Sequence, residues 1–213
     1  MLDDSIKAET QPDTNGENPK GHFIVKPSAE NIAAAAKAAG KKGPAPVHLW
    51  NPPFCGNLDM EIRRDGTWWY LGTPMGRMGL VKLFSSIIRK DGDDYFLVTP
   101  VEKVGIRVVD APFVATDFTA TGQSRDQILT FTTHVDDEAT AGPDHPIRVV
   151  RDAATGEPSP YIHIRANLEA LIDRKTFYRI IDLCVHEDHE GERWFGLWSS
   201  GIFFPIIPSA DLP

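Results

Sequence analysis

Hydrophobic and polar residues alternate along several short segments of the chain, which is the pattern of half-buried β-strands. The clearest case is residues 58–64, LDMEIRR. The Asp65-Gly66 pair that follows is a strong hairpin signal, and residues 67–71, TWWYL, supply the returning strand. By the same criterion the sequence predicts further strands over residues 94–100, 101–109, 112–118, 127–135, 145–152, 161–165 and 193–207.

Three other segments carry helical patterns. Residues 28–40 open with a capping serine, continue in alanines and end at a glycine. Residues 73–90 open with a Thr-Pro pair, in which the threonine caps and the proline takes the first helical position. Asp173 is predicted to cap a third helix over residues 174–185. The next segment, HEDHEGE at residues 186–192, is predicted as a polar turn.

Composition divides the chain into four parts. Residues 1–21 offer almost nothing to bury and are predicted as a disordered tail. Residues 22–46 hold the alanine-rich helix and a linker of lysine, glycine and proline. Residues 47–105 form an N-terminal module and residues 106–213 a C-terminal module.

The two modules repeat an order of elements: strand, turn, strand, capped amphipathic helix, acidic glycine turn and aromatic strand. Residues 62–100 are loosely echoed by residues 150–200, which we interpret as a degenerate internal duplication. Ordinary strand-helix-strand order is the alternative source of the echo. The predicted fold class is α+β, with two similar sheet-plus-helix modules and a ligand cleft between them.

The net charge of the chain limits the classes of binding partner that we expect. The 213 residues carry 22 lysines and arginines against 30 aspartates and glutamates, a net charge of -8, which disfavours bulk binding to nucleic acid or anionic lipid. Without an apolar run of about 20 residues or a secretory hydrophobic segment, we expect no membrane span and a cytoplasmic location. The two cysteines, Cys55 and Cys184, lack CxxC spacing and are predicted as small core residues.

A set of longer motifs spans residues 47–205: WNPPFCGNLDMEI, GTPMGR, LVKLFSSIIRKDG, YFLVTPVEKVGIRV, DAPF, DHPIRV and WSSGIFFP. Together they resemble the proteobacterial DUF 1285 family, a domain of unknown function. The chain departs from the usual family pattern at Asn57 and Val104. The resemblance implies a duplicated α/β core and a C-terminal module similar to pleckstrin-homology-like partial barrels. It also implies an inter-domain surface proposed to hold a nucleotide-like ligand, with a role in signal transduction and no established reaction.

Four candidate ligand-binding residues lie in the N-terminal module. Arg77 follows a glycine-rich turn near a predicted helix start, where a guanidinium can clamp an anion. Thr99, Glu102 and Lys103 flank Pro100, which cannot donate to a sheet and so requires an edge or a bend. Side chains at such a bend can point into a cleft, or can form an exposed edge with a surface ion pair.

The remaining candidates are Asp110, His145, Arg148, Tyr161, Arg165 and Trp198. Asp110 and His145 lie beside rigid proline turns at the predicted junction, although an aspartate before proline also serves simply to close a turn. Tyr161 and Arg165 share one face of a strand, which is either solvent or site. Trp198 offers a flat platform for a planar ligand.

The leading hypothesis from the sequence is a non-enzymatic regulator that binds a small anionic, nucleotide-like molecule between the modules. Arg77, Lys103 and Arg148 would offset the ligand charge, and no cofactor or metal is predicted. One alternative is a hydrolase or lyase in which His145 works with Asp144 or Glu102 as acid and base. Another is a protein-protein interaction module that takes up a partner peptide along a strand edge.

Overall fold

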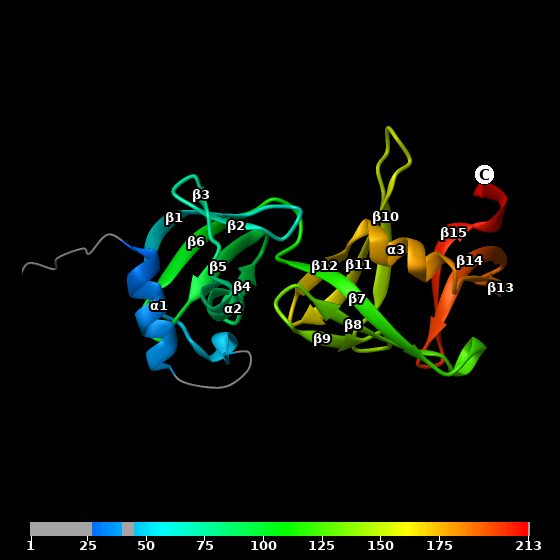
Figure 1. Cartoon of the computed structure of the whole chain (residues 1–213), viewed down its shortest axis with the longest axis horizontal. Helices are drawn as coiled ribbons and strands as arrows, with labels where there is room; N and C mark the ends of the chain where they lie inside the picture. The colour runs from blue at the N-terminus through cyan, green and yellow to red at the C-terminus, as the bar shows by residue number, and fades with distance from the viewer. Residues whose placement is uncertain (1–26, 40–44, 213) are drawn as a thin grey trace, which may run out of the picture.

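The structure, a computed structural model, describes residues 27–39 and 45–212. Within these residues the chain forms two modules that lie end to end along the long axis of the molecule (Figure 1). The tail predicted over residues 1–21 lies outside the described residues. Residues 22–26 and 40–44, on either side of the described part of the first predicted helix, also lie outside them. No helix in the described part of the chain is long and apolar enough to cross a membrane.

The N-terminal module is one six-stranded sheet with helices against one face. Its elements are α1 (Ala29–Ala38), the short 3-10 helix η1 (Val47–Leu49), β1 (Phe54–Ile62), β2 (Trp68–Tyr70), β3 (Thr73–Pro74), α2 (Met78–Ser85), β4 (Ile88–Asp91), β5 (Asp94–Val98) and β6 (Lys103–Val108). The strand order is β3-β2-β1-β6-β5-β4, and the central pair, β1 and β6, is parallel. Phe84 of α2 stacks on Trp68 of β2, and α1 packs against α2. The opposite face of this sheet carries neither helix.

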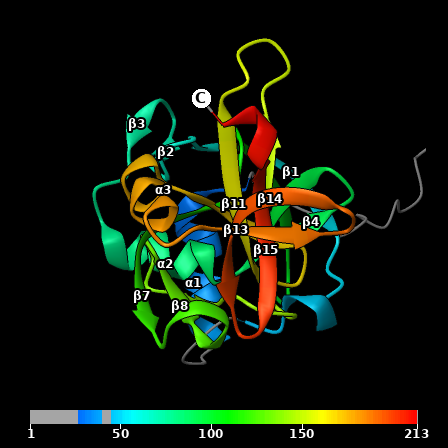
Figure 2. The same ribbon diagram turned by 90° about the vertical axis from the view of Figure 1, so that its right-hand side faces the viewer.

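The C-terminal module has a six-stranded sheet, a helix and a three-stranded sheet. Its elements are β7 (Phe113–Thr121), η2 (Ser124–Asp126), β8 (Ile128–Thr133), β9 (Glu138–Thr140), β10 (Ile147–Arg151), β11 (Pro158–Arg165), β12 (Leu168–Ile172), α3 (Arg174–Ile181), β13 (Val185–His189), β14 (Glu192–Ser199), β15 (Ile202–Pro208) and η3 (Ser209–Asp211). The strand orders are β10-β11-β12-β7-β8-β9 and β13-β14-β15. Because β10 also lies against β15, the two sheets together curl into a partial barrel. The β10–β11 hairpin projects beyond it, as Figure 2 shows.

Two of the three predicted helices begin where their capping residues indicate. The Ser28 hydroxyl accepts a hydrogen bond from the Asn31 amide at the start of α1, at 3.2 Å. The Asp173 carboxylate accepts one from the Thr176 amide at the start of α3, at 2.7 Å. Side-chain oxygens at these positions satisfy amides that a helix start leaves without partners.

The second predicted helix is wrong at both ends. Thr73 and Pro74 do not start it but form β3, which pairs with β2. The helix, α2, begins only at Met78, and the segment predicted as its last turn is the strand β4, paired with β5. Gly72 and Gly92 adopt positive φ values of 72° and 62° and close the two tight turns that make these pairings possible.

The polar segment after α3 also differs from its prediction. Residues 186–192 were expected as a turn, but β13 runs to His189 and pairs with β14, and only Glu190 and Gly191 form the turn. β13 lies at the edge of its sheet and exposes most of its side chains. An edge strand needs few apolar residues, so its sequence lacks the alternation that identifies a strand.

The order of elements repeats between the modules. β1–β3, α2 and β4–β6 form a three-strand meander, a helix and a second three-strand meander, and β10–β12, α3 and β13–β15 do the same. The C-terminal module adds β7–β9 to this plan. The α+β class and the two-module organisation are confirmed. The predicted module boundary between residues 105 and 106 falls inside β6, which stays in the first sheet up to Val108.

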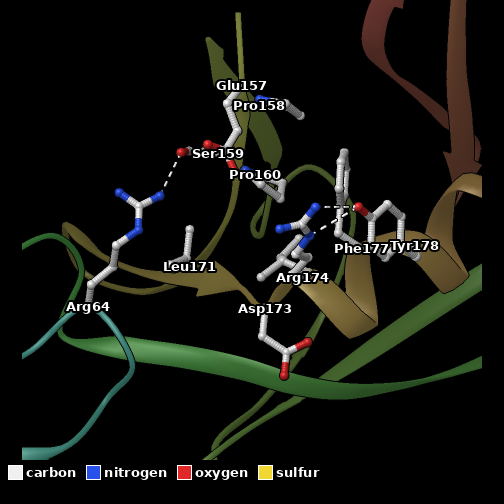
Figure 3. Close-up of a pocket in the computed structure, with 11 residues that line it drawn as sticks. Arg64, Glu157, Pro158, Ser159, Pro160, Leu171, Asp173, Arg174, Phe177 and Tyr178 are labelled. Atoms are coloured by element: carbon white, nitrogen blue, oxygen red, sulfur yellow. Dashed lines mark hydrogen bonds between the residues drawn. The ribbon is translucent and has the colours of Figure 1, made fainter. Parts of the chain in front are cut away.

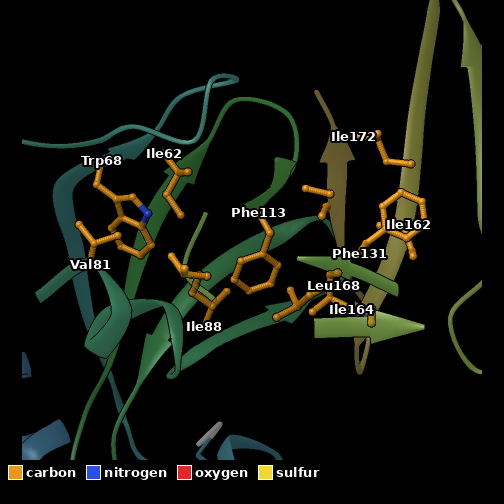
Figure 4. Packing of buried hydrophobic residues seen from close by; sticks show 14 of the residues in the cluster. Ile62, Trp68, Val81, Ile88, Phe113, Phe131, Ile162, Ile164, Leu168 and Ile172 are labelled. Carbon is orange, nitrogen blue, oxygen red and sulfur yellow. The ribbon is translucent and has the colours of Figure 1, made fainter. Parts of the chain in front are cut away.

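A continuous hydrophobic core joins the modules at the surface between them, which we call the seam. Phe113, the first residue of β7, is fully buried and lies between Ile88 of the N-terminal module and Leu168 of the C-terminal one (Figure 4). The guanidinium of Arg165 lies 4.6 Å from the centre of its ring. Apolar burial of this extent fixes how the modules sit against each other.

Polar contacts cross the seam around this core. The Arg165 Nη2 donates to the Ser85 carbonyl at 2.7 Å, and the same guanidinium pairs with Asp137. Lys82 of α2 pairs with Asp136 of the β8–β9 turn. Because one guanidinium binds both a backbone carbonyl of the first module and a carboxylate of the second, it links the two directly.

His134, in the β8–β9 turn, packs against the hairpin turn of the N-terminal module. A Cβ at Gly66 would lie 3.3 Å from the His134 Nε2, so this glycine allows the close approach. The His134 Nδ1 accepts a hydrogen bond from the Val114 amide at 3.2 Å, which requires that nitrogen to be unprotonated. Burial lowers the pKa of His134, while the carboxylates of Asp137 and Asp65 oppose the shift in part.

Replacement of Phe113 tests the contribution of the seam core. Phe113→Ala should reduce the free energy of unfolding by about 3–5 kcal/mol, because a buried ring is replaced by a cavity between packed modules. The matched control is Phe54→Ala, whose ring is 57% exposed and whose loss should change stability by less than about 0.5 kcal/mol. Equal effects of the two substitutions in urea denaturation would show that the modules do not depend on this contact.

The environment of His134 predicts a pH dependence of stability. In the unfolded chain the imidazole regains its ordinary pKa of 6.5, whereas in the folded chain the pKa is lower. As the pH falls from about 7.5 through this range, the unfolded state takes up the proton first and the free energy of unfolding decreases. His134→Gln should flatten this decrease between about pH 7.5 and 5 in urea denaturation. His186→Gln, on the distant β13, is the control, and an unchanged slope in His134→Gln would contradict the assignment.

Candidate functional site

Three of the predicted ligand residues meet at one side of the seam. The Tyr161 hydroxyl donates to the Asp110 carboxylate at 2.8 Å, and the guanidinium of Arg148 lies 4.4 Å from the centre of the Tyr161 ring. Arg64, from the β1–β2 turn, reaches the other Asp110 oxygen at 3.2 Å. Burial raises the pKa of Tyr161, and the bond to Asp110 raises it further. Tyr161 is therefore a hydrogen-bond donor at neutral pH that holds Asp110 in place.

Arg148, which was predicted to offset the charge of a ligand, is paired with a carboxylate of the protein. Its Nε and Nη2 donate to both oxygens of Glu169 at 2.7 and 2.6 Å, a bidentate ion pair. This pairing lowers the pKa of Glu169, so the carboxylate stays charged and keeps the guanidinium occupied.

At the predicted bend around Pro100, the threonine Thr99 has a structural role. Thr99 is fully buried, and its hydroxyl accepts from the Glu102 amide at 3.2 Å, which closes the turn between β5 and β6. Glu102 is half-buried, and burial raises the pKa of its carboxyl. Lys103 donates to Asp91 at 2.7 Å and lies 3.8 Å from the centre of the Phe96 ring.

Of the remaining four predicted residues, Arg165 lies at the seam as described above, and the other three lie apart from both groups. Arg77 is exposed and has no ion-pair partner among the described residues. The His145 Nδ1 contacts the His163 carbonyl at 3.0 Å within the C-terminal module. Trp198 belongs to the three-stranded sheet, where it packs against Phe203 with the ring centres 5.4 Å apart. The ten residues therefore do not converge on a single cleft.

One cavity of about 260 Å³, which we call the α3 groove, lies beside Arg64 (Figure 3). Its walls come from the start of β11, the end of β12 and the first turns of α3. Arg174 donates from Nε and Nη2 to the Tyr178 hydroxyl at 3.0 and 2.9 Å, and Arg64 donates to the Ser159 hydroxyl at 2.8 Å. Glu157 and Asp173 also line the groove, so it balances its two cations with two carboxylates.

A second cavity, of about 340 Å³, opens at another part of the seam, and we call it the seam cavity. It is lined by residues 45–48, by Ser86, Ile88 and Arg89 at the α2–β4 junction, and by Arg165, Ala166, Asn167 and Leu168 at the β11–β12 turn. Most of these side chains are apolar. The charged ones are Arg89 and Arg165, with His48 beside them, and no carboxylate lines the described walls. The volume is within the range of small-molecule sites.

Hydrogen bonds and ion pairs to neighbouring groups hold Arg89 and Arg165 in place. Arg89 donates to the Trp50 carbonyl at 2.7 Å and to Asp91 at 2.9 Å, and Asp91 also binds Lys103. Burial acts to raise the pKa of Asp91, but the hydrogen bonds from Lys103 and Arg89 lower it overall. Arg165 donates two of its five N–H groups to Ser85 and Asp137. The arginines are therefore rigid, and Arg165 keeps donors free.

Sequence patterns did not identify Arg64, Arg89 or His48 as site residues. Arg89 was assigned to the end of a predicted helix where the structure has the strand β4, and Arg64 to the end of the predicted strand that precedes the Asp65-Gly66 turn. Arg64 reaches the seam through contacts with Asp110 at the module junction and with Ser159 of the second module, whereas Arg89 is placed by Val47, Trp50 and Asp91 of its own module. These are tertiary contacts, which no local pattern signals. No group of three or more metal-ligating side chains occurs in the part of the chain that the structure describes.

Comparison with known families and structures agrees with this architecture. The model of the "Domain of unknown function (DUF1285), N-terminal domain" matches residues 45–111, and that of the "Protein of unknown function (DUF1285), C-terminal domain" matches residues 112–206. No curated protein matches the chain.

Two solved structures are similar to the chain. The crystal structure of a DUF1285 family protein from Silicibacter pomeroyi DSS-3 is 62% identical, with a TM-score of 0.78, over 84% of this chain and 96% of that one. A DUF1285 family protein from Shewanella baltica OS155 is 28% identical, with a TM-score of 0.47, over 59% of this chain and 91% of that one. Both family models match in order and together cover most of the described residues, so the chain belongs to the DUF1285 family.

Proposed function

We propose that the protein binds a small anionic molecule with an apolar body in the seam cavity. The observation that supports this most directly is the pair Arg89 and Arg165, which come from different modules and line an otherwise largely apolar cavity without a lining carboxylate. Apolar walls with a few fixed polar groups are the usual composition of small-molecule sites.

The charge balance around the cavity favours an anion. Arg89, Lys103 and Arg165 provide three positive charges, and Asp91 and Asp137 provide two negative ones. One positive charge is left over, and the free N–H groups of Arg165 can donate to a carboxylate or phosphate oxygen in charge-assisted hydrogen bonds. The apolar side chains on the remaining wall, such as Ile88 and Leu168, would cover the body of the ligand.

Binding at this position would act on both modules at once. A ligand that accepts from the free N–H groups of Arg165 and is attracted by the charge of Arg89 would contact both modules and stabilise the closed arrangement of the seam over any opened one. Such a ligand would change the population of module arrangements, which is how a regulatory protein without catalysis passes on a signal. The protein would then act as a ligand-dependent regulator.

Thermal unfolding with benzoate tests the proposal, with benzamide as its uncharged control. For a Kd of about 1 mM, 10 mM benzoate contributes about 1.4 kcal/mol, which corresponds to a rise in Tm of roughly 3–6 °C. Octanoate and phenyl phosphate extend the test to a longer body and a different anion. Benzamide should leave Tm unchanged.

Variants locate the binding. Arg165→Gln should abolish the shift, and Arg125→Gln, which removes an exposed arginine beside Trp198, should keep it. Val47→Trp retains both arginines and fills the cavity, so it should abolish the shift even if Arg165→Gln is too unstable to measure. Stabilisation by none of the three anions, or an undiminished shift in Val47→Trp, would refute binding in the seam cavity.

A further inference from the structure

The face of the N-terminal sheet that carries neither α1 nor α2 holds a third cavity, which we call the outer groove. It has a volume of about 380 Å³ and crosses β1, β6 and β5. Its principal residues are Phe54, Asn57, Asp94, Phe96, Lys103 and Gly105. These lie on the face away from α2. The outer groove shares no lining residue with the seam cavity, and the Asp91 carboxylate between them binds Lys103 of the groove and Arg89 of the cavity. A ligand in the outer groove would be independent of the proposed function.

The floor of the groove is a single row across three strands. Asn57 of β1 lies opposite Gly105 of β6, which in turn lies opposite Phe96 of β5. The Asn57 amide covers the backbone of Gly105, and a Cβ at that position would overlap the amide oxygen. The amide thus lies in the groove, exposed, and makes no side-chain hydrogen bond to any residue of the described ranges 27–39 and 45–212.

Two phenylalanine rings form a corner beside this amide. Phe54 and Phe96 are perpendicular, at 88°, with ring centres 6.1 Å apart. Phe54 is 57% exposed, which is high for a phenylalanine in a sheet strand. The register between β1 and β6 shifts between Phe54 and Asn57, and such irregularities re-aim side chains near binding sites.

The ends of the groove carry both signs of charge. Lys103 lies over the Phe96 ring and is held by Asp91, and Asp94 is exposed at the other end. The groove therefore favours neither a strong anion nor a strong cation, in contrast to the seam cavity. Its chemistry suits a neutral molecule that stacks on a ring and forms hydrogen bonds at its edge.

We propose that the outer groove binds a planar heteroaromatic molecule whose ring carries a hydrogen-bond donor and an acceptor at one edge. The ring stacks on the exposed face of Phe54, with an edge towards Phe96, in the two arrangements that aromatic rings prefer. The Asn57 amide, which has both a donor and an acceptor, pairs with the polar edge of the ligand.

Saturation-transfer NMR and calorimetry on the full chain test this, with nicotinamide and adenine as probes and glucose as a polar molecule without a flat ring. The ring protons of a probe should receive saturation, and the affinity should be in the millimolar range. Phe54→Ala and Asn57→Leu should each weaken binding at least tenfold, and Phe54→Tyr should retain it. Circular dichroism of each variant confirms that it is folded.

Failure of both probes to bind, or binding that persists in Phe54→Ala and Asn57→Leu, would overturn the proposal. Preference for glucose over the two rings would overturn it as well, because the groove would then recognise a sugar. Competition with octanoate, which has no ring, separates this site from the seam cavity, since octanoate at about 10 mM should leave nicotinamide binding unchanged. Displacement of nicotinamide by octanoate would place the ring at the seam and reject the outer groove.

Discussion

The arrangement of the two modules depends on the contact between Phe113 and Arg165 at the seam. Phe113 is buried where the two cores meet, and the Arg165 guanidinium covers its ring while binding Ser85 and Asp137. The Arg165 guanidinium is largely removed from water, and Ser85 and Asp137 compensate part of that loss, so these two partners must keep their places. Apolar burial supplies the attraction between the modules, and this polar requirement selects one relative position.

The fixed relative position of the two modules explains why cavities remain on either side of the Phe113–Arg165 contact. Two modules that meet at a central core do not match each other everywhere, and cavities remain where Arg64 of the hairpin turn borders the α3 groove and Arg89 of β4 borders the seam cavity. On one side Asp110, Tyr161 and Arg64 close the gap with hydrogen bonds. On the other side the walls of the seam cavity are mostly apolar, and the charged side chains that line them are Arg89 and Arg165.

Local signals predicted the local features of this fold and failed where pairing at a distance decided the outcome. The capping roles of Ser28 and Asp173 followed from the sequence because a cap interacts with amides two or three residues away. The helix start at Thr73 was an equally good local signal, but pairing with β2 outweighed it. The proline turn after Asp110 placed this residue at the module junction, but its hydrogen bond with Tyr161 was not predicted. Arg64 and Arg89 likewise reach the seam through tertiary contacts that leave no trace in neighbouring residues.

An acidic protein with an anion site is not a contradiction, because the two properties act over different distances. The net charge of -8 is spread over the surface, and at physiological ionic strength its field is screened beyond about 8 Å. Within the seam cavity the nearest charges are arginines fixed by carbonyls and carboxylates behind them, in surroundings where water is partly excluded. Interactions at contact distance in such surroundings are much stronger than screened repulsion from the surface. The local geometry of Arg89 and Arg165 therefore decides which ligands the cavity accepts, and the overall charge affects mainly how fast an anion arrives.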